Sequence, residues 1–245
     1  MKGKVSKNKF LKVVLPALLV VAIICQAVGF QVVLAKGNVA TTSSDSISNL
    51  TDQQLQALTN PILQSYKADS SHKVWKMTDD SRLAVLANQT NIENARLQEV
   101  VKLVNSEFVE KEIISSPLAM VYAQEKDVSY GDILIDIDQT SSITSSSNSK
   151  EAYKITIGEN GVRLTGASEN AIMHGLRTIQ NLIITNDGLV YGEIVDYPNV
   201  AERRVHVDCA RKYISKDWFI RQIREMSYMK MNALQIHFSE NMGFR

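Results

Sequence analysis

The sequence predicts an α/β protein in which a small domain, with a mixed or antiparallel sheet and helices on one face, precedes a strand-helix-strand unit. Residues 153–166 alternate apolar and polar side chains on both sides of Glu159-Asn160-Gly161, and Asn-Gly is a strong hairpin signal. From residue 201, a short strand, a helix and a second strand follow with short links. Short links of this kind indicate two parallel strands joined by a right-handed crossover.

The first 35 residues have the pattern of an export segment. Five lysines and no acidic residue occur among the first 12 residues, and an apolar run follows over residues 13–34. This order is typical of a signal peptide, with cleavage after Ala35. An uncleaved membrane anchor stays open, because the run is long enough to span a bilayer, and a buried core helix is the third interpretation. We expect an extracellular or cell-surface protein that touches a membrane only through such an anchor.

A linker and short helices are predicted over residues 36–72. Residues 37–49 are small and polar, which is typical of a tether. Leucine and isoleucine then recur at helical spacing over residues 50–66, with Thr51 or Asp52 as the N-cap and an interruption at Pro61.

The small α/β domain is predicted over residues 73–196. Strands are expected over residues 82–86, 118–123 and 132–138, and the last alternates aspartate with isoleucine or leucine, as a half-buried strand does. Helices are expected over residues 91–111 and 169–184. Their apolar stripes consist of Leu97, Val100, Val101, Val104 and Phe108 in the first, and Ile172, Leu176, Ile179 and Ile183 in the second.

Composition and charge exclude several classes of function. The net charge is +1, so nothing indicates a nucleic-acid partner. Only Cys25 and Cys209 are present, and loss of Cys25 with the signal would leave no intrachain disulfide. The four histidines are scattered and no metal-binding motif occurs, so neither a metal nor another cofactor is predicted.

The last segment, residues 197–245, places polar side chains at the ends of its two strands. In barrels of parallel strands, functional side chains gather at the C-terminal ends of the strands. The first strand delivers Asp208 and Arg211 to that end, and the second delivers His237, Glu240 and Asn241. These residues predict a site. The alternative is an ion pair between Asp208 and Arg211 that only holds a loop.

The helix between those strands is expected to start at Ser215 and to turn Phe219, Ile223 and Met226 inward. Two parallel strands cannot cover both of their faces. We therefore expect a fragment of a larger enzyme, and poor solubility for residues 201–245 because they present an unpaired edge.

At these residues the sequence resembles glycoside hydrolase family 20, the β-N-acetylhexosaminidases. Residues 203–213 (RRVHVDCARKY) resemble the family's first barrel strand, residues 226–232 (MSYMKMN) its Met-Ala-Tyr-x-Lys-x-Asn run, and residues 237–241 (HFSEN) its His-x-x-Asp-Asp/Asn strand end. Residues 153–184 resemble the end of the small domain that precedes that barrel. Arg204, Lys212 and Glu240 depart from the family's usual Gly, His and Asp.

The resemblance implies the start of a TIM barrel and a retaining hydrolysis of N-acetylhexosamine-terminated glycans, with the substrate's acetamido oxygen as nucleophile. It implies that Arg211 hydrogen-bonds the sugar hydroxyls and that Glu240 supports a histidine that orients the catalytic acid. The family's catalytic Asp-Glu pair is absent here. The acidic residues after position 200 are Glu202, Asp208, Asp217, Glu225 and Glu240.

We therefore expect no hydrolysis by the chain as written. The alternative function is a non-catalytic surface carbohydrate-binding or adaptor protein. A reading frame that continues beyond Arg245 to an Asp-Glu pair, about 100 residues on in a barrel of the usual size, would favour the enzyme. The choice between GlcNAc and GalNAc stays open.

Overall fold

A computed structural model describes residues 47–138, 149–240 and 243–244. Its helices are α3 (Asp52–Gln56), α4 (Gln89–Ile92), α5 (Ala95–Glu110), α6 (Glu169–Asn186) and α7 (Lys216–Tyr228), with a short 3-10 turn, η1 (Glu125–Asp127). Its strands are β1 (Ser65–Ala68), β2 (Val74–Trp75), β3 (Arg82–Leu86), β4 (Ala119–Ala123), β5 (Ile133–Ile137), β6 (Tyr153–Gly158), β7 (Gly161–Gly166), β8 (Leu189–Val190), β9 (Gly192–Asp196), β10 (Arg204–Asp208), β11 (Ala233–His237), β12 (Ser239–Glu240) and β13 (Gly243–Phe244).

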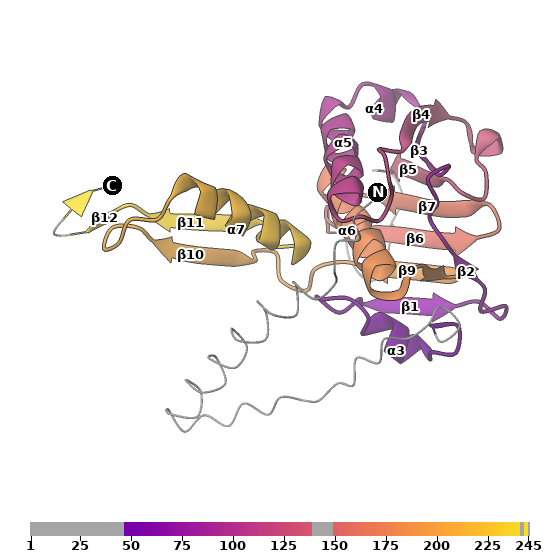
Figure 1. Cartoon of the computed structure of the whole chain (residues 1–245), viewed down its shortest axis with the longest axis horizontal. Coiled ribbons are helices and arrows are strands. Elements are labelled where there is room, and N and C mark those ends of the chain that lie inside the picture. The colour runs from indigo at the N-terminus through magenta and orange to yellow at the C-terminus, as the bar shows by residue number, and fades with distance from the viewer. Residues whose placement is uncertain (1–46, 139–148, 241–242, 245) are drawn as a thin grey trace, which may run out of the picture. The chain divides into compact units, whose positions relative to one another are not determined.

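The main sheet is mixed, as the sequence predicted. Its seven strands follow the order β1-β9-β6-β7-β5-β3-β4 (Figure 1). The pairs from β1 to β7 are antiparallel, and the pairs that join β7, β5, β3 and β4 are parallel. The predicted hairpin is β6-β7, and Gly161 after its turn has φ +89°, where a side chain would meet the carbonyl oxygen of Asp132.

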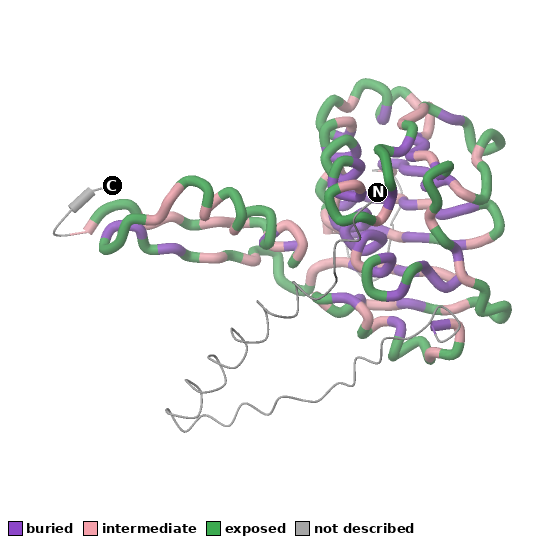
Figure 2. The backbone as a smooth tube through the Cα atoms, in the orientation of Figure 1, coloured by how far each residue is buried: buried purple, intermediate pink, exposed green. Residues whose placement is uncertain are grey.

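The helices α5 and α6 lie together on one face of this sheet and bury a single core against it (Figure 1). Both predicted apolar stripes are buried there, from Leu97 to Phe108 and from Ile172 to Ile183 (Figure 2). The opposite face of the sheet carries a much smaller apolar cluster, around Ala84 and Leu134. Alternation along each strand produces this division, because Leu83 and Val85 face the helices while Ala84 faces away.

The structure corrects two of the expected helices. Thr51 does cap a helix, but α3 ends at Gln56, and residues 65–68 form β1 instead of a continued helix. The sheet thus takes in residues that we expected in the linker, because backbone pairing with β9 outweighs the local helical pattern. The expected helix over residues 91–111 is divided into α4 and α5, with Asn94 as the cap of α5.

The strand β5 is buried along its whole length, and not half-buried as its alternating pattern predicted. The acidic residues at and beside it lose solvent but gain polar partners. Asp132 accepts hydrogen bonds from Arg82 at 2.6 and 2.9 Å, and Asp136 accepts from Asn88 and Asn91 at 3.1 and 3.0 Å. These two aspartates are therefore buried acids with hydrogen-bond partners, and they do not form a solvent-exposed face.

The unit β10-α7-β11 has the predicted parallel strands, in register from Arg204 opposite Ala233 to Asp208 opposite His237. Ser215 caps α7 as expected. Of the predicted inward positions only Met226 is buried, Phe219 is half-buried and Ile223 is 52% exposed. The described part of this unit gives α7 only two strands to pack on, so its apolar stripe is not fully covered.

Within residues 47–138, 149–240 and 243–244, no helix is both long and apolar enough to cross a membrane. The predicted export segment, residues 1–35, lies outside those ranges.

Candidate functional site

The polar rim predicted at the C-terminal ends of β10 and β11 is assembled in the structure. Arg211 Nη2 lies 3.3 Å from Glu240 Oε1, and its Nε lies 3.8 Å from Asp208 Oδ2. His237 Nε2 is 3.6 Å from the same Glu240 oxygen. Four of the five predicted site residues are therefore brought together. The fifth, Asn241, lies outside the described residues.

The backbone fixes this rim more firmly than its ion pairs do. Cys209 N donates to His237 O at 2.9 Å, which continues the strand ladder past Asp208, and Ala210 N donates to Asp208 Oδ1 at 2.9 Å. Arg211 is 75% exposed, so its ion pairs contribute little to stability. Its guanidinium lies closer to Glu240, at 3.3 Å, than to Asp208, at 3.8 Å. The ion pair with Asp208, which was the alternative to a site, is therefore the weaker of the two contacts.

The imidazole rings of His206 and His237 are stacked, with centroids 6.1 Å apart and planes at 15°. Together with Arg211 and Glu240 they give the rim an open surface of hydrogen-bond donors and acceptors. Such a surface suits hydroxyl groups, because a guanidinium presents five N–H donors in a planar fork.

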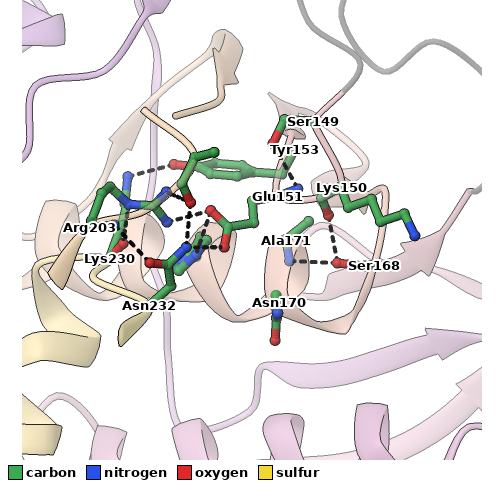
Figure 3. Close-up of polar contacts among 12 residues, drawn as sticks. Ser149, Lys150, Glu151, Tyr153, Ser168, Asn170, Ala171, Arg203, Lys230 and Asn232 are labelled. Atoms are coloured by element: carbon green, nitrogen blue, oxygen red, sulfur yellow. Dashed lines mark hydrogen bonds and ion pairs between the residues drawn. The ribbon is translucent and has the colours of Figure 1, made fainter. Parts of the chain in front are cut away.

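A second polar cluster lies where the β10-α7-β11 unit meets the small domain. Glu151 accepts hydrogen bonds there from Arg203 Nη2 and from Asn232 Nδ2, the latter at 3.1 Å (Figure 3). His174 Nε2 lies 3.8 Å from the same carboxylate. Burial works to raise the pKa of Glu151, but the neighbouring His174, Arg203 and Asn232 side chains outweigh it and lower the pKa to about 2.

A second carboxylate at this junction, Asp196 at the end of β9, pairs with Lys230. Lys230 Nζ donates to Asp196 Oδ2 and to the Tyr153 hydroxyl, both at 2.8 Å. Tyr153 in turn donates to Asp196 at 2.6 Å. Burial lowers the pKa of Lys230, against the pull of Asp196, and raises that of Tyr153.

Lys230 reaches this position because α7 ends there. Met231 N donates to Met226 O at 2.9 Å, and Lys230 has φ 54°, the left-handed geometry that closes many helices. Glycine usually holds that place. The buried contacts of the Lys230 side chain account for a lysine there.

Arg177 of α6 completes the contact from the other side. Its guanidinium is buried, pairs with Glu107 of α5, and lies 4.3 Å from the ring centroid of Tyr228. Its Nε donates to Ser227 Oγ at 3.2 Å. The end of α7 is therefore held by charged groups of the small domain over several residues.

A pocket of about 250 Å³ opens beside this cluster, lined on its apolar side by Pro61, Ile62, Tyr197, Pro198 and Val200. His174 also lines it, and both ring nitrogens of this buried side chain lack a hydrogen-bond partner among the described residues.

Sequence reasoning did not identify the junction. In the sequence, Lys230 and Asn232 belong to the MSYMKMN run, and Asp196 is the last residue of the predicted small domain. Glu151 lies 81 residues before Asn232, and Tyr153 lies 77 residues before Lys230 and 43 before Asp196, so no local spacing joins them. A buried-charge argument could have helped, since a lysine at a helix end next to an apolar strand needs an acid.

Comparison with known families matches the two parts of the chain separately. The sequence model described as "Glycosyl hydrolase family 20, domain 2" matches residues 61–197. The one described as "Glycosyl hydrolase family 20, catalytic domain" matches residues 202–245.

Among curated proteins, Beta-hexosaminidase B of Pseudoalteromonas piscicida is 31% identical over 94 residues, which is 38% of this chain and 12% of that protein. The Beta-hexosaminidase of Akkermansia muciniphila is 29% identical over 99 residues, which is 39% of this chain and 20% of that protein. The chain thus spans a fifth or less of the length of these two relatives.

Among solved structures, the N-acetyl-beta-hexosaminidase of Streptomyces plicatus in complex with Thio-NAglucal has a TM-score of 0.62 at 17% identity, over 80% of this chain and 37% of that one. The chitobiase of Flavobacterium johnsoniae has a TM-score of 0.63 at 18% identity, over 80% of this chain and 29% of that one. At these identities the likeness concerns the fold.

Proposed function

This chain belongs to glycoside hydrolase family 20, whose domain 2 matches more than half of it, and from that premise we propose that it supplies the small domain and the first sugar-binding rim of a β-N-acetylhexosaminidase. The proposed reaction removes terminal non-reducing GlcNAc or GalNAc from glycans. It proceeds with retention, and the substrate's own acetamido oxygen is the nucleophile.

The observation that carries the proposal is the rim of Arg211, His237 and Glu240 at the C-terminal ends of two parallel strands. Arg211, which the family resemblance connects with sugar binding, lies 3.3 Å from a Glu240 oxygen, and His237 lies 3.6 Å from the same oxygen. That end of a barrel sheet is where enzymes of this architecture place their sites. The curated relatives named above support the same activity.

The chain's own residues take part in binding and not in bond cleavage. Arg211 is placed to donate hydrogen bonds to ring hydroxyls, and Glu240 to hold both Arg211 and His237. Residues 201–245 contain no adjacent Asp-Glu pair to hold the acetamide and protonate the leaving oxygen. The 245-residue polypeptide alone is therefore expected to release no 4-nitrophenol from 4-nitrophenyl N-acetyl-β-glucosaminide above a buffer blank.

The test uses the gene product that carries this chain, assayed with the 4-nitrophenyl glycosides of GlcNAc and GalNAc. Release of 4-nitrophenol from either, with the β-configured sugar as first product, is expected. A folded product that contains an Asp-Glu pair but cleaves neither substrate would refute the proposal and favour a carbohydrate-binding role.

We also propose that the protein is exported. Five lysines followed by the apolar run of residues 13–34 support this, and the expected cleavage follows Ala35. Mass analysis of protein recovered from the producing cells tests it. A mature chain that begins at Lys36 agrees with a cleaved signal, an intact first residue in the membrane fraction indicates an anchor, and an intact chain in the cytoplasm contradicts export.

A further inference from the structure

The two barrel strands start at one shared clamp. Arg203, just before β10, donates its backbone N–H to Asn232 Oδ1 at 2.9 Å. Asn232, just before β11, donates its own N–H back to Arg203 O at 3.1 Å, and Ala233 N reaches the same oxygen at 3.2 Å. The starts of both strands therefore move as one piece.

A single side chain of the small domain holds both halves of that clamp. Glu151 accepts from the Arg203 guanidinium through one carboxylate oxygen and from the Asn232 amide through the other (Figure 3). Its side chain is only 14% exposed. Charge-assisted hydrogen bonds to a buried carboxylate are among the strongest polar contacts in proteins. Among the described carboxylates at this junction, Glu151 is the one that contacts both strand starts, since Asp196 contacts the helix end through Lys230.

The clamp and the rim lie at opposite ends of the same strands. β10 and β11 pair in register over five residues, from Arg204 to Asp208 and from Ala233 to His237. The ladder continues through Cys209 N to His237 O. A paired ladder of this length, roughly 15 Å at the rise of a β-strand, transmits a rotation of its start to its end.

We propose that Glu151 is a positioning residue for the rim: by holding the starts of β10 and β11, it sets where Arg211, His237 and Glu240 stand relative to the small domain. The description of the rim as a sugar site rests on the proposed function. The clamp itself requires no sugar, so it can be tested even if that function fails.

The experiment compares E151Q with the unaltered chain by NMR of the histidine rings at pH 7. Glutamine keeps the size and an acceptor oxygen of Glu151 but removes its charge. The matched control is E193Q, which removes the same charge from β9, where Glu193 is 45% exposed and pairs with Lys154 at 2.9 Å. The four histidines serve as reporters. His237 and His206 lie on the barrel strands, His174 lies beside Glu151, and His72 is exposed in a loop of the small domain.

In E151Q the ring signals of His237 and His206 should move, while those of His72 stay in place. In E193Q the ring signals of His237 and His206 should also stay in place, and any change should be confined to groups next to residue 193. Loss of stability alone does not move the signals of molecules that remain folded. Amide exchange supplies the second measurement. Protection over β10 and β11 should fall by about 10- to 100-fold in E151Q, as expected for a lost charged hydrogen bond, while protection over β5 and β7 is unchanged.

Two outcomes would overturn the proposal. One is that only the His174 signals move, which makes Glu151 a local contact. The other is an equal fall in protection over β5, β7, β10 and β11, which makes it a general stabilising residue. Restoration of the His237 signals by E151D, which keeps the charge, would further support positioning through the carboxylate.

Discussion

Acid should weaken the junction between the small domain and the barrel strands through the single carboxylate of Glu151. Its pKa in the folded chain is lowered from 4.5 to about 2. A displacement of that size corresponds to about 3 kcal/mol, at roughly 1.36 kcal/mol per pKa unit. Because the folded state favours the carboxylate, this stabilisation is complete above about pH 4.5 and is lost as the pH falls towards 2.

E151Q isolates this contribution, since it removes one titrating group and leaves the others. Urea unfolding followed by tryptophan fluorescence should give the unaltered chain a free energy of unfolding about 2 to 3 kcal/mol above that of E151Q at pH 7. The difference should shrink through pH 4 and 3 and approach zero near pH 2. A difference that is constant from pH 7 to pH 2.5 would refute the reasoning, as would equal stabilities at pH 7.

Three further changes test the site and its support. Lys230→Met should lower the free energy of unfolding in urea by about 3 to 5 kcal/mol, because Asp196 stays buried without its cation. The double variant with Asp196→Asn should lose less stability than Lys230→Met alone, and strictly additive effects of the two changes would contradict this pairing. Gly192→Ala should destabilise the fold by about 1 to 3 kcal/mol, because Gly192 has φ 146° and a side chain there would lie 2.0 Å from Lys67 O. An unchanged melting temperature would show that the strand adapts. In the active gene product, Arg211→Ala should lower kcat/KM by about 10- to 150-fold through lost hydrogen bonds to the sugar, and an unchanged kcat/KM would remove Arg211 from the site.

Several features of the fold followed from local sequence signals. The β6-β7 hairpin depends on a turn whose residues adjoin, the caps Thr51 and Ser215 act on backbone within the same turn, and α6 needs only its own periodicity. The rim was also predictable. Asp208 and His237 end two neighbouring parallel strands, so topology alone brings them to one edge.

Other features could not be predicted because competing long-range contacts decide them. Residues 65–66 continue a helical pattern, yet they pair with Val195 and Ile194 of β9 to form a sheet edge. The aspartates around β5 resemble a solvated face until Arg82 and Asn88 are placed against them. In each case the deciding partner is tens of residues away.

The sequence by itself determined the family, the order of the small domain and the barrel strands, and the presence of Arg211 and Glu240 at one rim. These depend on residue identity and on spacing within a few turns of chain. Only the tertiary structure decided that Glu151 and Asp196 receive Arg203, Asn232 and Lys230. Such contacts join residues 34 to 81 positions apart, and the burial that makes each charge need a partner exists only once the chain has folded.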